Sequence, residues 1–272
     1  MRALINGAPG ETVPIADRGL QYGDGVFETL PVHTGRPAHW ARHRARLEEG
    51  CRRLSIAAPG SVLDEEVHAL CSGVDRAVLK VIVTRGTSGR GYRPIAGPCT
   101  RIVSLHPYPD HPTENRERGV ALRLCRTRLA SNPTLAGIKH LNRLEQVLAR
   151  GEWNDDAHAE GLMLDYRDRV IAGTMSNVFV VRAGVLVTPE LGECGVAGVT
   201  RARILESAPL LDIDARVDDL ALEDAVDADE LFVCNSVIDV WPVRRFQGRD
   251  YAVGPVTEAV GARLAADDAE QD

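Results

Sequence analysis

The sequence predicts an α/β (α+β) protein of two domains. Its 272 residues, 44% of them hydrophobic and 26% charged, are enough for one large or two modest hydrophobic cores. Short apolar runs typical of strands alternate with segments of helical period along the chain. Residues 107–118 contain three prolines and many charges without periodicity, which is typical of a linker. We therefore expect an N-terminal domain over residues 1–108, a linker over 109–118 and a C-terminal domain over 119–272.

The first domain is expected to begin with strands and turns and to continue with two helices. A strand near Ala3–Ile5 precedes an Asn-Gly turn, and a hairpin is expected over residues 22–35. From Trp40 to Leu54 the apolar residues recur at helical spacing, and a second helix is expected over residues 63–71. Two β-rich runs, 77–84 and 101–105, flank the glycine-rich loop 85–94, whose three arginines could present cations to a bound anion.

The second domain is expected to begin with a strand over residues 120–124. Lys139 then stands just ahead of a predicted amphipathic helix whose apolar face is formed by Leu141, Leu144, Val147 and Leu148. Further elements are expected in the order strand 160–164, strand 177–182, glycine-rich loop 194–200, helix 201–211 and a last buried strand over 231–234.

Composition favours an enzyme or binding protein for a small molecule. The net charge of -7, without a run of basic residues interleaved with aromatics, argues against a nucleic-acid partner. A signal peptide is not apparent, and nowhere do about 18 apolar residues follow one another, so we expect a cytoplasmic protein without a membrane span. The six cysteines form no C-x-x-C pair, and His39 and His43 have no third ligand nearby, so no metal site is expected.

Lysine is almost absent from the chain. Of 32 basic residues only Lys80 and Lys139 are lysines, and the others are arginines. Because arginine is effectively never deprotonated, it cannot serve as an amine nucleophile or general base. A lysine that is retained in such a chain therefore indicates a catalytic role, although chance explains the retention of Lys80 or of Lys139, taken alone, equally well. Lys80 lies in the probable strand 78–83, where a structural lysine that reaches towards solvent is the simpler interpretation.

Gly198-Val199-Thr200 is a candidate phosphate site. The glycine permits close backbone approach, and the threonine can cap a helix whose free N–H groups favour an anion. Taken alone, the same three residues are more typical of a simple helix cap. The sequence contains no G-x-S-x-G motif and no P-loop, which excludes the usual signatures of serine hydrolases and nucleoside triphosphatases.

Six segments, taken in order, resemble the fold-type IV pyridoxal-phosphate enzymes, and within them most closely the aminodeoxychorismate lyases. This resemblance implies a smaller N-terminal α+β domain and a larger C-terminal domain with a barrel-like β-sheet. The lysine segment is the most specific of the six. They are QYGDGVFET (21–29), RGTSGRGY (85–92), GIKHLNRLEQVL (137–148), SNVF (176–179), GVTR (198–201) and CNSVIDVWPV (234–243).

The resemblance implies a role for nine residues. Lys139 would bind pyridoxal 5'-phosphate as a Schiff base and then shuttle protons. The implied ligands of the cofactor phosphate are Arg46, Val199, Thr200, Asn235 and Ser236, although a helical wheel favours Arg44 over Arg46. The implied substrate contacts are Arg90 and Tyr92 at a carboxylate and the aromatic ring of Tyr108, while Arg85 and Arg93 are weaker candidates.

One position departs from the family pattern. Fold-type IV enzymes carry a glutamate that pairs with the pyridine nitrogen of the cofactor, and this chain has Ala172 in its place. The adjacent sequence offers no obvious replacement acid.

The activity that the resemblance implies is the elimination of pyruvate from 4-amino-4-deoxychorismate, giving p-aminobenzoate for folate biosynthesis, by a homodimer. A D-amino-acid or branched-chain aminotransferase is the nearest alternative. A protein that binds pyridoxal phosphate with little turnover is a second alternative, because of Ala172. The third is a cofactor-free α/β binding protein.

Overall fold

The computed structural model describes residues 2–269, which form two compact units. The first unit extends to Pro109 and includes Ile138–Asn142, and the second consists of Asp110–Gly137 and the chain from Arg143 onwards. The chain therefore passes between the units three times. The domain limits expected from the sequence stay a prediction, and the structure adds the short segment 138–142 to the first unit.

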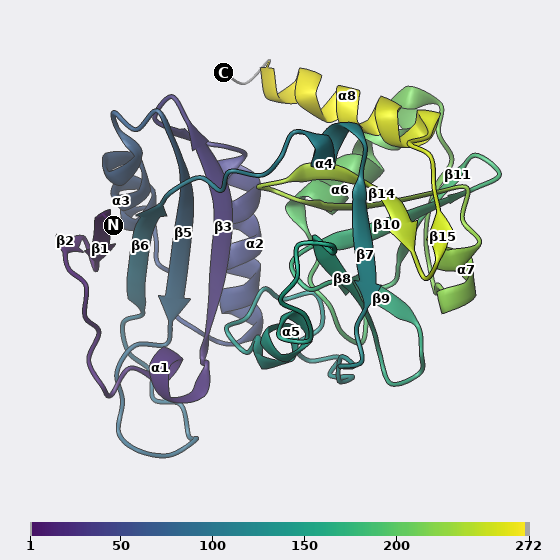
Figure 1. Ribbon diagram of the computed structural model, residues 1–272. Helices are drawn as coiled ribbons and strands as arrows, with labels where there is room; N and C mark the ends of the chain where they lie inside the picture. Colours follow the sequence, from purple (N-terminus) through teal and green to yellow (C-terminus); the bar gives the residue numbers. More distant parts are fainter. Residues whose placement is uncertain (1, 270–272) are drawn as a thin grey trace. The chain divides into compact units, whose positions relative to one another are not determined.

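The first unit is an antiparallel six-stranded sheet with helices packed on one face (Figure 1). Its strand order is β2-β1-β6-β5-β3-β4. The strands are β1 (Arg2–Ile5), β2 (Ala8–Pro9), β3 (Gly25–His33), β4 (Arg36–Pro37), β5 (Arg76–Thr84) and β6 (Thr100–His106). The helices are α1 (Arg18–Tyr22), α2 (Trp40–Arg53) and α3 (Val62–Cys71).

Side-chain alternation gives this sheet two different faces. On β3, Val26 and Leu30 enter the hydrophobic core, where they meet residues of α2 and α3 such as Leu47 and Leu63. Phe27 and Thr29 point to the opposite face because successive strand residues alternate. In the register of β3 with β5, Thr29 lies opposite Lys80 and Phe27 opposite Ile82, so these four residues share the second face.

The second unit is a mixed nine-stranded sheet of order β12-β11-β10-β13-β14-β7-β8-β9, with β15 paired to β14. β9, at one end of this order, also contacts β10 and β11, so the sheet curls towards a barrel. Its strands are β7 (Val120–Leu124), β8 (Glu160–Leu164), β9 (Val170–Gly173), β10 (Asn177–Arg182), β11 (Val185–Pro189), β12 (Ala215–Asp218), β13 (Glu230–Asn235), β14 (Asp239–Phe246) and β15 (Arg249–Asp250).

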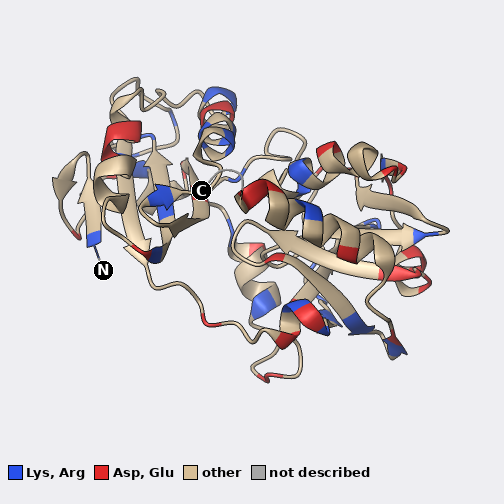
Figure 2. Ribbon diagram, turned by 90° about the horizontal axis from the view of Figure 1, so that it is seen from above, with Lys and Arg blue, Asp and Glu red and all other residues tan. Residues whose placement is uncertain are grey.

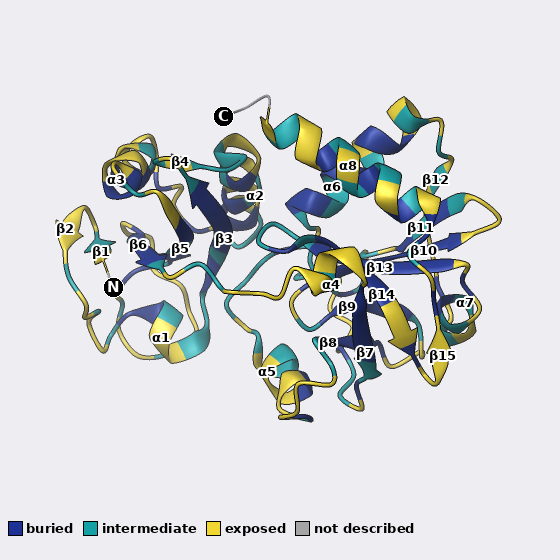
Figure 3. Ribbon diagram, turned by 45° about the horizontal axis from the view of Figure 1, so that its top comes forward, coloured by how far each residue is buried: buried dark blue, intermediate teal, exposed yellow. Residues whose placement is uncertain are grey.

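Helices α6 (Val199–Ser207) and α8 (Pro255–Ala269) pack against this sheet. The core beneath them includes the stacked rings of Phe179 and Phe232, 5.0 Å apart, and α8 alternates between exposed and less exposed positions (Figure 3). Acidic and basic residues are interspersed over the unit (Figure 2). The remaining helices are α4 (Glu114–Glu117), α5 (Leu144–Arg150), α7 (Leu222–Val226) and a 3-10 turn (Ala208–Leu211). Within residues 2–269, no helix has the length and apolar character needed to cross a membrane.

The structure corrects three details of the predicted elements. Leu141 lies outside the helix expected around it, which begins only at Leu144, because its backbone N–H donates to Gly25 of β3. The strand over 231–234 is not the last one, since β14 and β15 follow it. The helix expected over 201–211 begins two residues earlier, at Val199, and its last four residues form the 3-10 turn.

Candidate active site

Lys139 lies in an extended segment beside β3 in the first unit. The backbone N–H of Phe27 donates to the carbonyl of Lys139 (2.9 Å), and that of Leu141 donates to Gly25 (2.9 Å). A β-bridge joins His140 to Val26. The side-chain Nζ of Lys139 lies 4.5 Å from the centroid of the Phe27 ring, so its ammonium form gains a cation–π contact. The backbone of the candidate reactive lysine is therefore fixed on both sides.

A buried acid, Glu28, lies beneath Arg46 in the same unit. Arg46 donates from Nε (2.8 Å) and Nη2 (2.6 Å) to the two oxygens of Glu28, and Nδ1 of His43 lies 2.6 Å from Oε2. The Glu28 side chain is fully buried. Burial alone would raise the pKa of Glu28, but the charge and hydrogen bonds of Arg46, with the hydrogen bond of His43, lower the pKa to about 2. One edge of the Arg46 guanidinium is thus committed to Glu28.

His43 is neutral in this arrangement. Burial lowers the pKa of His43, and the positive charges of Arg46 and Lys139 add to that effect, although Glu28 opposes it. A neutral imidazole donates its Nδ1–H to the carboxylate of Glu28. Sequence reasoning missed Glu28, although the alternation along β3 places it on the core face between Val26 and Leu30, where an acid needs a cationic partner.

The start of α6, in the second unit, could hold an anion. A Cβ on Gly198 would lie 2.0 Å from Oδ1 of Asn177, whose Nδ2 donates to the carbonyl of Val196 (2.9 Å), so only glycine permits this close approach. The free N–H groups of the first helical turn then follow at Val199 and Thr200. The Thr200 side chain is buried, and its Oγ1 lies 3.5 Å from Oγ of Ser236.

Val199, Thr200 and Ser236 lie together in the structure. The side chain of Asn235, in contrast, is bonded to backbone groups. Oδ1 of Asn235 accepts from the backbone N–H groups of Val237 (2.8 Å) and Ile238 (3.0 Å), and its Nδ2 donates to the carbonyl of Met175 (3.1 Å). The Asn235 side chain therefore holds the turn after β13 in shape. Backbone N–H groups and two hydroxyls at a helix start suit a phosphate, so this half of the site fits the expected cofactor.

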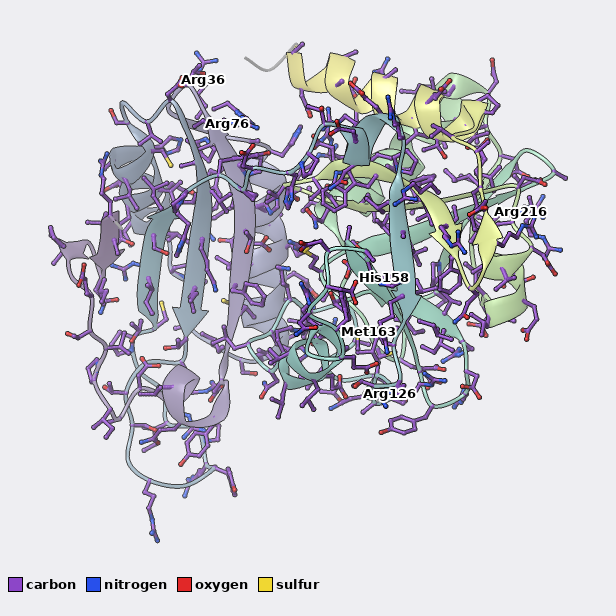
Figure 4. All side chains as sticks on the ribbon, in the orientation of Figure 1. Arg36, Arg76, Arg126, His158, Met163 and Arg216 are labelled. Carbon is purple, nitrogen blue, oxygen red and sulfur yellow. The ribbon has the colours of Figure 1, made fainter. Side chains whose placement is uncertain are left out.

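Ala172 lies in β9 among apolar side chains. It is buried opposite Met163 of β8 (labelled in Figure 4) and packs in a cluster with Trp153 and Cys125. Glu160, at the start of the neighbouring strand β8, is also a buried acid. Its carboxylate accepts hydrogen bonds from residues 161 and 174–176, at distances of 2.5–3.1 Å. The Glu160 carboxylate is therefore already used by Gly161 and by the loop of residues 174–176. Since the other residues packed around position 172 are apolar, this region does not fit the pyridine nitrogen of the cofactor.

The three arginines of the glycine-rich loop have different surroundings. Arg85 donates to both oxygens of Asp24 (2.7 and 3.0 Å) and to the carbonyls of Leu54 and Ser55 (2.7 Å each), so it is structural. Arg90 and Arg93 are exposed and make no hydrogen bond or ion pair within the described residues.

The two tyrosines expected near the substrate lie at different ends of the first sheet. The exposed ring of Tyr92 packs against Tyr22 at a centroid distance of 5.5 Å, beside the β3 end that carries Phe27. The Tyr108 ring lies under the guanidinium of Arg76 (4.0 Å; Arg76 is labelled in Figure 4) and 5.9 Å from His33. His33 is six residues beyond Phe27, or about 20 Å of strand. The roles of both tyrosines stay predictions.

The chain belongs to the amino-transferase class IV family, whose model matches residues 25–246. This result confirms the resemblance and the fold class expected from the sequence. The chain is 38% identical over 268 residues to the aminodeoxychorismate lyase of Vibrio harveyi, covering 96% of this chain and 98% of that protein. A crystal structure of 4-amino-4-deoxychorismate lyase from Pseudomonas aeruginosa matches with a TM-score of 0.94 and 46% identity, covering 97% and 98% of the two chains.

Aminotransferases of the family are more distant. A putative branched-chain-amino-acid aminotransferase of Methanocaldococcus jannaschii is 30% identical over 254 residues, which cover 90% of this chain and 88% of that protein. The branched-chain amino acid aminotransferase of Escherichia coli shares the fold, with a TM-score of 0.86 and 24% identity over 98% of this chain and 94% of that one.

Proposed function

We propose that this protein is a pyridoxal-phosphate-dependent lyase that converts 4-amino-4-deoxychorismate into p-aminobenzoate and pyruvate, a step of folate biosynthesis. The observation that carries the proposal is the Lys139 segment, which combines the lyase-like sequence GIKHLNRLEQVL with a backbone fixed against β3. The near full-length similarity to two lyases supports the same choice over an aminotransferase. The two products account for every atom of the substrate, so the reaction needs neither water nor an oxidant.

The proposed cofactor contacts follow from the chemistry of each residue. Val199, Thr200 and Ser236 would hold the phosphate, with Asn235 shaping the adjacent turn and Arg46 supplying positive charge. Lys139 would carry the cofactor as a Schiff base. When bound, pyridoxal phosphate supplies a sink for the electrons left when a proton leaves the carbon bearing the amine.

Lys139 would also move the proton. Its Nζ would take the proton from the carbon bearing the amine and return it to the departing enolpyruvyl group. Arg90 and Tyr92 would hold a substrate carboxylate, because a guanidinium can donate to both oxygens at once.

The working form that we propose is a cytoplasmic homodimer. Helix α5 exposes Leu144, Val147 and Leu148 by 68%, 62% and 57%, and such an apolar face suits a second copy of the chain. The six cysteines are buried free thiols, which suits a reducing compartment.

The test is to supply the protein with pyridoxal phosphate and 4-amino-4-deoxychorismate and to measure pyruvate release. We expect turnover in the wild type and none in Lys139→Arg, which keeps the charge but cannot form a Schiff base. A parallel assay supplies D-alanine or a branched-chain amino acid with a keto acid. Amino transfer faster than pyruvate release would identify an aminotransferase and end the proposal.

Ala172 favours a second candidate function, a protein that binds pyridoxal phosphate with little turnover. Such a protein would show the visible absorbance of lysine-linked cofactor, and borohydride reduction would label Lys139. It would nevertheless release no pyruvate from 4-amino-4-deoxychorismate.

A further inference from the structure

The loop of residues 174–176, between β9 and β10, is hydrogen-bonded to the turn that carries Ser236. The carbonyl of Met175 accepts from Nδ2 of Asn235 at 3.1 Å. Oδ1 of the same asparagine accepts from two backbone N–H groups of its turn, at 2.8 and 3.0 Å. The loop and the turn are therefore joined through one side chain, and the position of the turn depends on the position of the loop.

The same loop leads directly to a contact with the start of α6. Asn177, the residue after the loop, donates from Nδ2 to the carbonyl of Val196 at 2.9 Å. Its Oδ1 leaves no room for a side chain at Gly198, because a Cβ there would be only 2.0 Å away. Val199 then begins α6. Both halves of the proposed phosphate site, the turn after β13 and the start of α6, are thus connected to one short loop.

One buried carboxylate, that of Glu160, holds this loop in place. Glu160 is the first residue of β8, which pairs with β9 (Figure 1), and it is 1% exposed. Its Oε1 accepts from the backbone N–H (3.0 Å) and the hydroxyl (2.5 Å) of Thr174. Its Oε2 accepts from the backbone N–H of Met175 (3.1 Å) and the hydroxyl of Ser176 (2.8 Å). Each residue of the loop therefore donates to Glu160.

The surroundings of Glu160 admit its carboxylate without supplying a cation. A Cβ at Gly173 would lie 2.8 Å from Oε2 of Glu160 and 2.1 Å from Oγ of Ser176, so only glycine leaves room for this contact. Within residues 2–269 Glu160 makes no ion pair, whereas the buried carboxylates of Glu28 and Glu66 pair with arginines. Since a buried carboxylate needs hydrogen bonds, the donors of the loop and the carboxylate of Glu160 stabilise each other.

We infer that Glu160 is a positioning residue for recognition of the cofactor phosphate. Its carboxylate fixes the loop 174–176, and the loop fixes, through Asn235 and Asn177, the two elements that would meet the phosphate. This inference rests on the phosphate site of the proposed function but not on the lyase reaction. The preference of the protein for a phosphorylated over an unphosphorylated cofactor then depends on a residue that acts through the loop.

The experiment compares pyridoxal 5'-phosphate with pyridoxal, which has the same ring and aldehyde without the phosphate. Each compound is titrated into the full chain freed of cofactor, and the visible absorbance of the lysine-linked form measures binding. In Glu160→Gln an amide of the same size replaces the carboxylate, and its NH2 group faces donors that need an acceptor. We expect this variant to lose about 10- to 100-fold of the preference for the phosphorylated compound, as for a lost hydrogen bond to a charged group, while the affinity for pyridoxal changes little.

Glu230→Gln is the matched control. Glu230 is likewise a buried acid at the first position of a strand, β13. Its carboxylate accepts from the backbone N–H groups of Val256 (3.1 Å) and Thr257 (2.7 Å) and from the hydroxyl of Thr257 (2.6 Å), at the start of α8. Glu230→Gln should lose stability in denaturant unfolding as Glu160→Gln does, but it should keep the wild-type preference because Glu230 holds a different element.

Two further variants test the role of the carboxylate itself. Glu160→Asp retains an acid that is one methylene shorter, and it should regain part of the preference that Glu160→Gln loses. Ser176→Ala removes one of the four hydrogen bonds between the loop and Glu160 and leaves the carboxylate in place. It should lose about 2- to 10-fold of the preference, so the inference stays testable if Glu160→Gln folds poorly.

The outcomes separate this inference from the proposed function. The role of Glu160 would be overturned by a wild type that binds both compounds equally, by Glu160→Gln or Ser176→Ala with the full preference, or by an equal loss in Glu230→Gln. A wild type whose preference depends on Glu160 but which releases no pyruvate from 4-amino-4-deoxychorismate would overturn the lyase proposal and leave the positioning role standing.

Discussion

At Ala172 a methyl group occupies the position at which the family pattern has a carboxylate. The surrounding side chains are apolar, and Glu160, a buried acid close to the following loop, accepts four hydrogen bonds from residues 174–176 and one from Gly161. Among the described residues packed in a cluster with Ala172, none is an acid that could pair with the pyridine nitrogen of a bound cofactor. The residue at position 172 would therefore limit how strongly a bound pyridoxal phosphate could act as an electron sink.

Restoring the acid should raise the rate of pyruvate release. A charge-assisted hydrogen bond contributes about 1.5–3 kcal/mol, which corresponds to roughly 10- to 150-fold in rate if it lowers only the barrier. We expect an increase within this range for Ala172→Glu. Ala172→Gln is the matched control, since it has the same length without the charge. Equal rates in the wild type and both variants would show that position 172 does not limit the reaction.

The residues of the candidate site differ in how well they could be predicted from the sequence. Lys139, Val199 and Thr200 stand in motifs whose local geometry is encoded within a few residues. Glu28 was missed because its importance depends on Arg46 and His43, which come from α2 and meet it only in the folded sheet. The contact of Lys80 with the ring that Lys139 also contacts could not be predicted, because a strand pattern does not show which distant segment lies beside it.

The junction between Gly198 and α6 shows how neighbouring strands can prepare a helix start to hold an anion. Asn177, at the first position of β10, holds the carbonyl of Val196 and leaves no room for a side chain at position 198. The helix then begins with N–H groups that have no partner within the helix. A small change at the glycine should therefore affect the anion site more than the fold as a whole.

Gly198→Ala should weaken cofactor binding by about tenfold or more, because the new Cβ would displace Asn177 and break its hydrogen bond to Val196, at a cost of about 1–3 kcal/mol. Titration with pyridoxal phosphate measures this loss. Gly261→Ala in α8 is the control. A Cβ there meets nothing within 4 Å, so the variant should bind the cofactor normally and unfold at slightly higher urea. Unchanged cofactor affinity in Gly198→Ala would contradict the anion-site assignment.

Strands and helices with a regular spacing of apolar residues were predicted well. Elements whose apolar pattern is interrupted were not. β5 and β7 follow apolar runs and differ from the predicted ranges by one residue at most. β14 was missed because Pro242 and two arginines interrupt its pattern, although Pro242 is paired opposite Phe232. The apolar face of α5 was predicted from spacing, yet it is exposed, because spacing cannot distinguish a face that packs in a core from an apolar face on the surface.

On the scale of the whole molecule, buried ion pairs make stability depend on pH. The pKa of Glu28 lies at about 2, well below its ordinary 4.5. The pKa of Asp165 is lowered as well. Burial alone would raise it, but backbone and side-chain hydrogen bonds and the charge of Arg169 outweigh that effect. A carboxyl whose folded pKa is lowered stabilises the protein above its unfolded pKa, and this stabilisation is lost as the pH falls through the folded pKa.

The free energy of unfolding should therefore fall between about pH 4.5 and pH 2, with Glu28 as a main contributor. Glu28→Gln should be less stable than the wild type at pH 7, by about 3–5 kcal/mol, because it leaves Arg46 without its buried partner. The difference between the two proteins should shrink at pH 3. Denaturant unfolding at several pH values measures both quantities.

Glu49→Gln is the control for this series, because Glu49 pairs with Arg52 on the surface of α2. Its unfolding curves should follow the wild type at each pH. If Glu28→Gln and the wild type lost stability in parallel on acidification, another group would have to carry the acid sensitivity.

The return of residues 138–142 to the first unit has a consequence for the order of biosynthesis. When a ribosome has released the chain up to Pro109, β3 still lacks the backbone partners of Gly25 and Phe27, which come from Leu141 and Lys139. About thirty further residues must be translated before that gap can close. The first unit is therefore completed by an extended segment that is translated late, and this segment carries the amine on which the proposed chemistry depends. A gene divided after codon 109 would encode a first half without that amine.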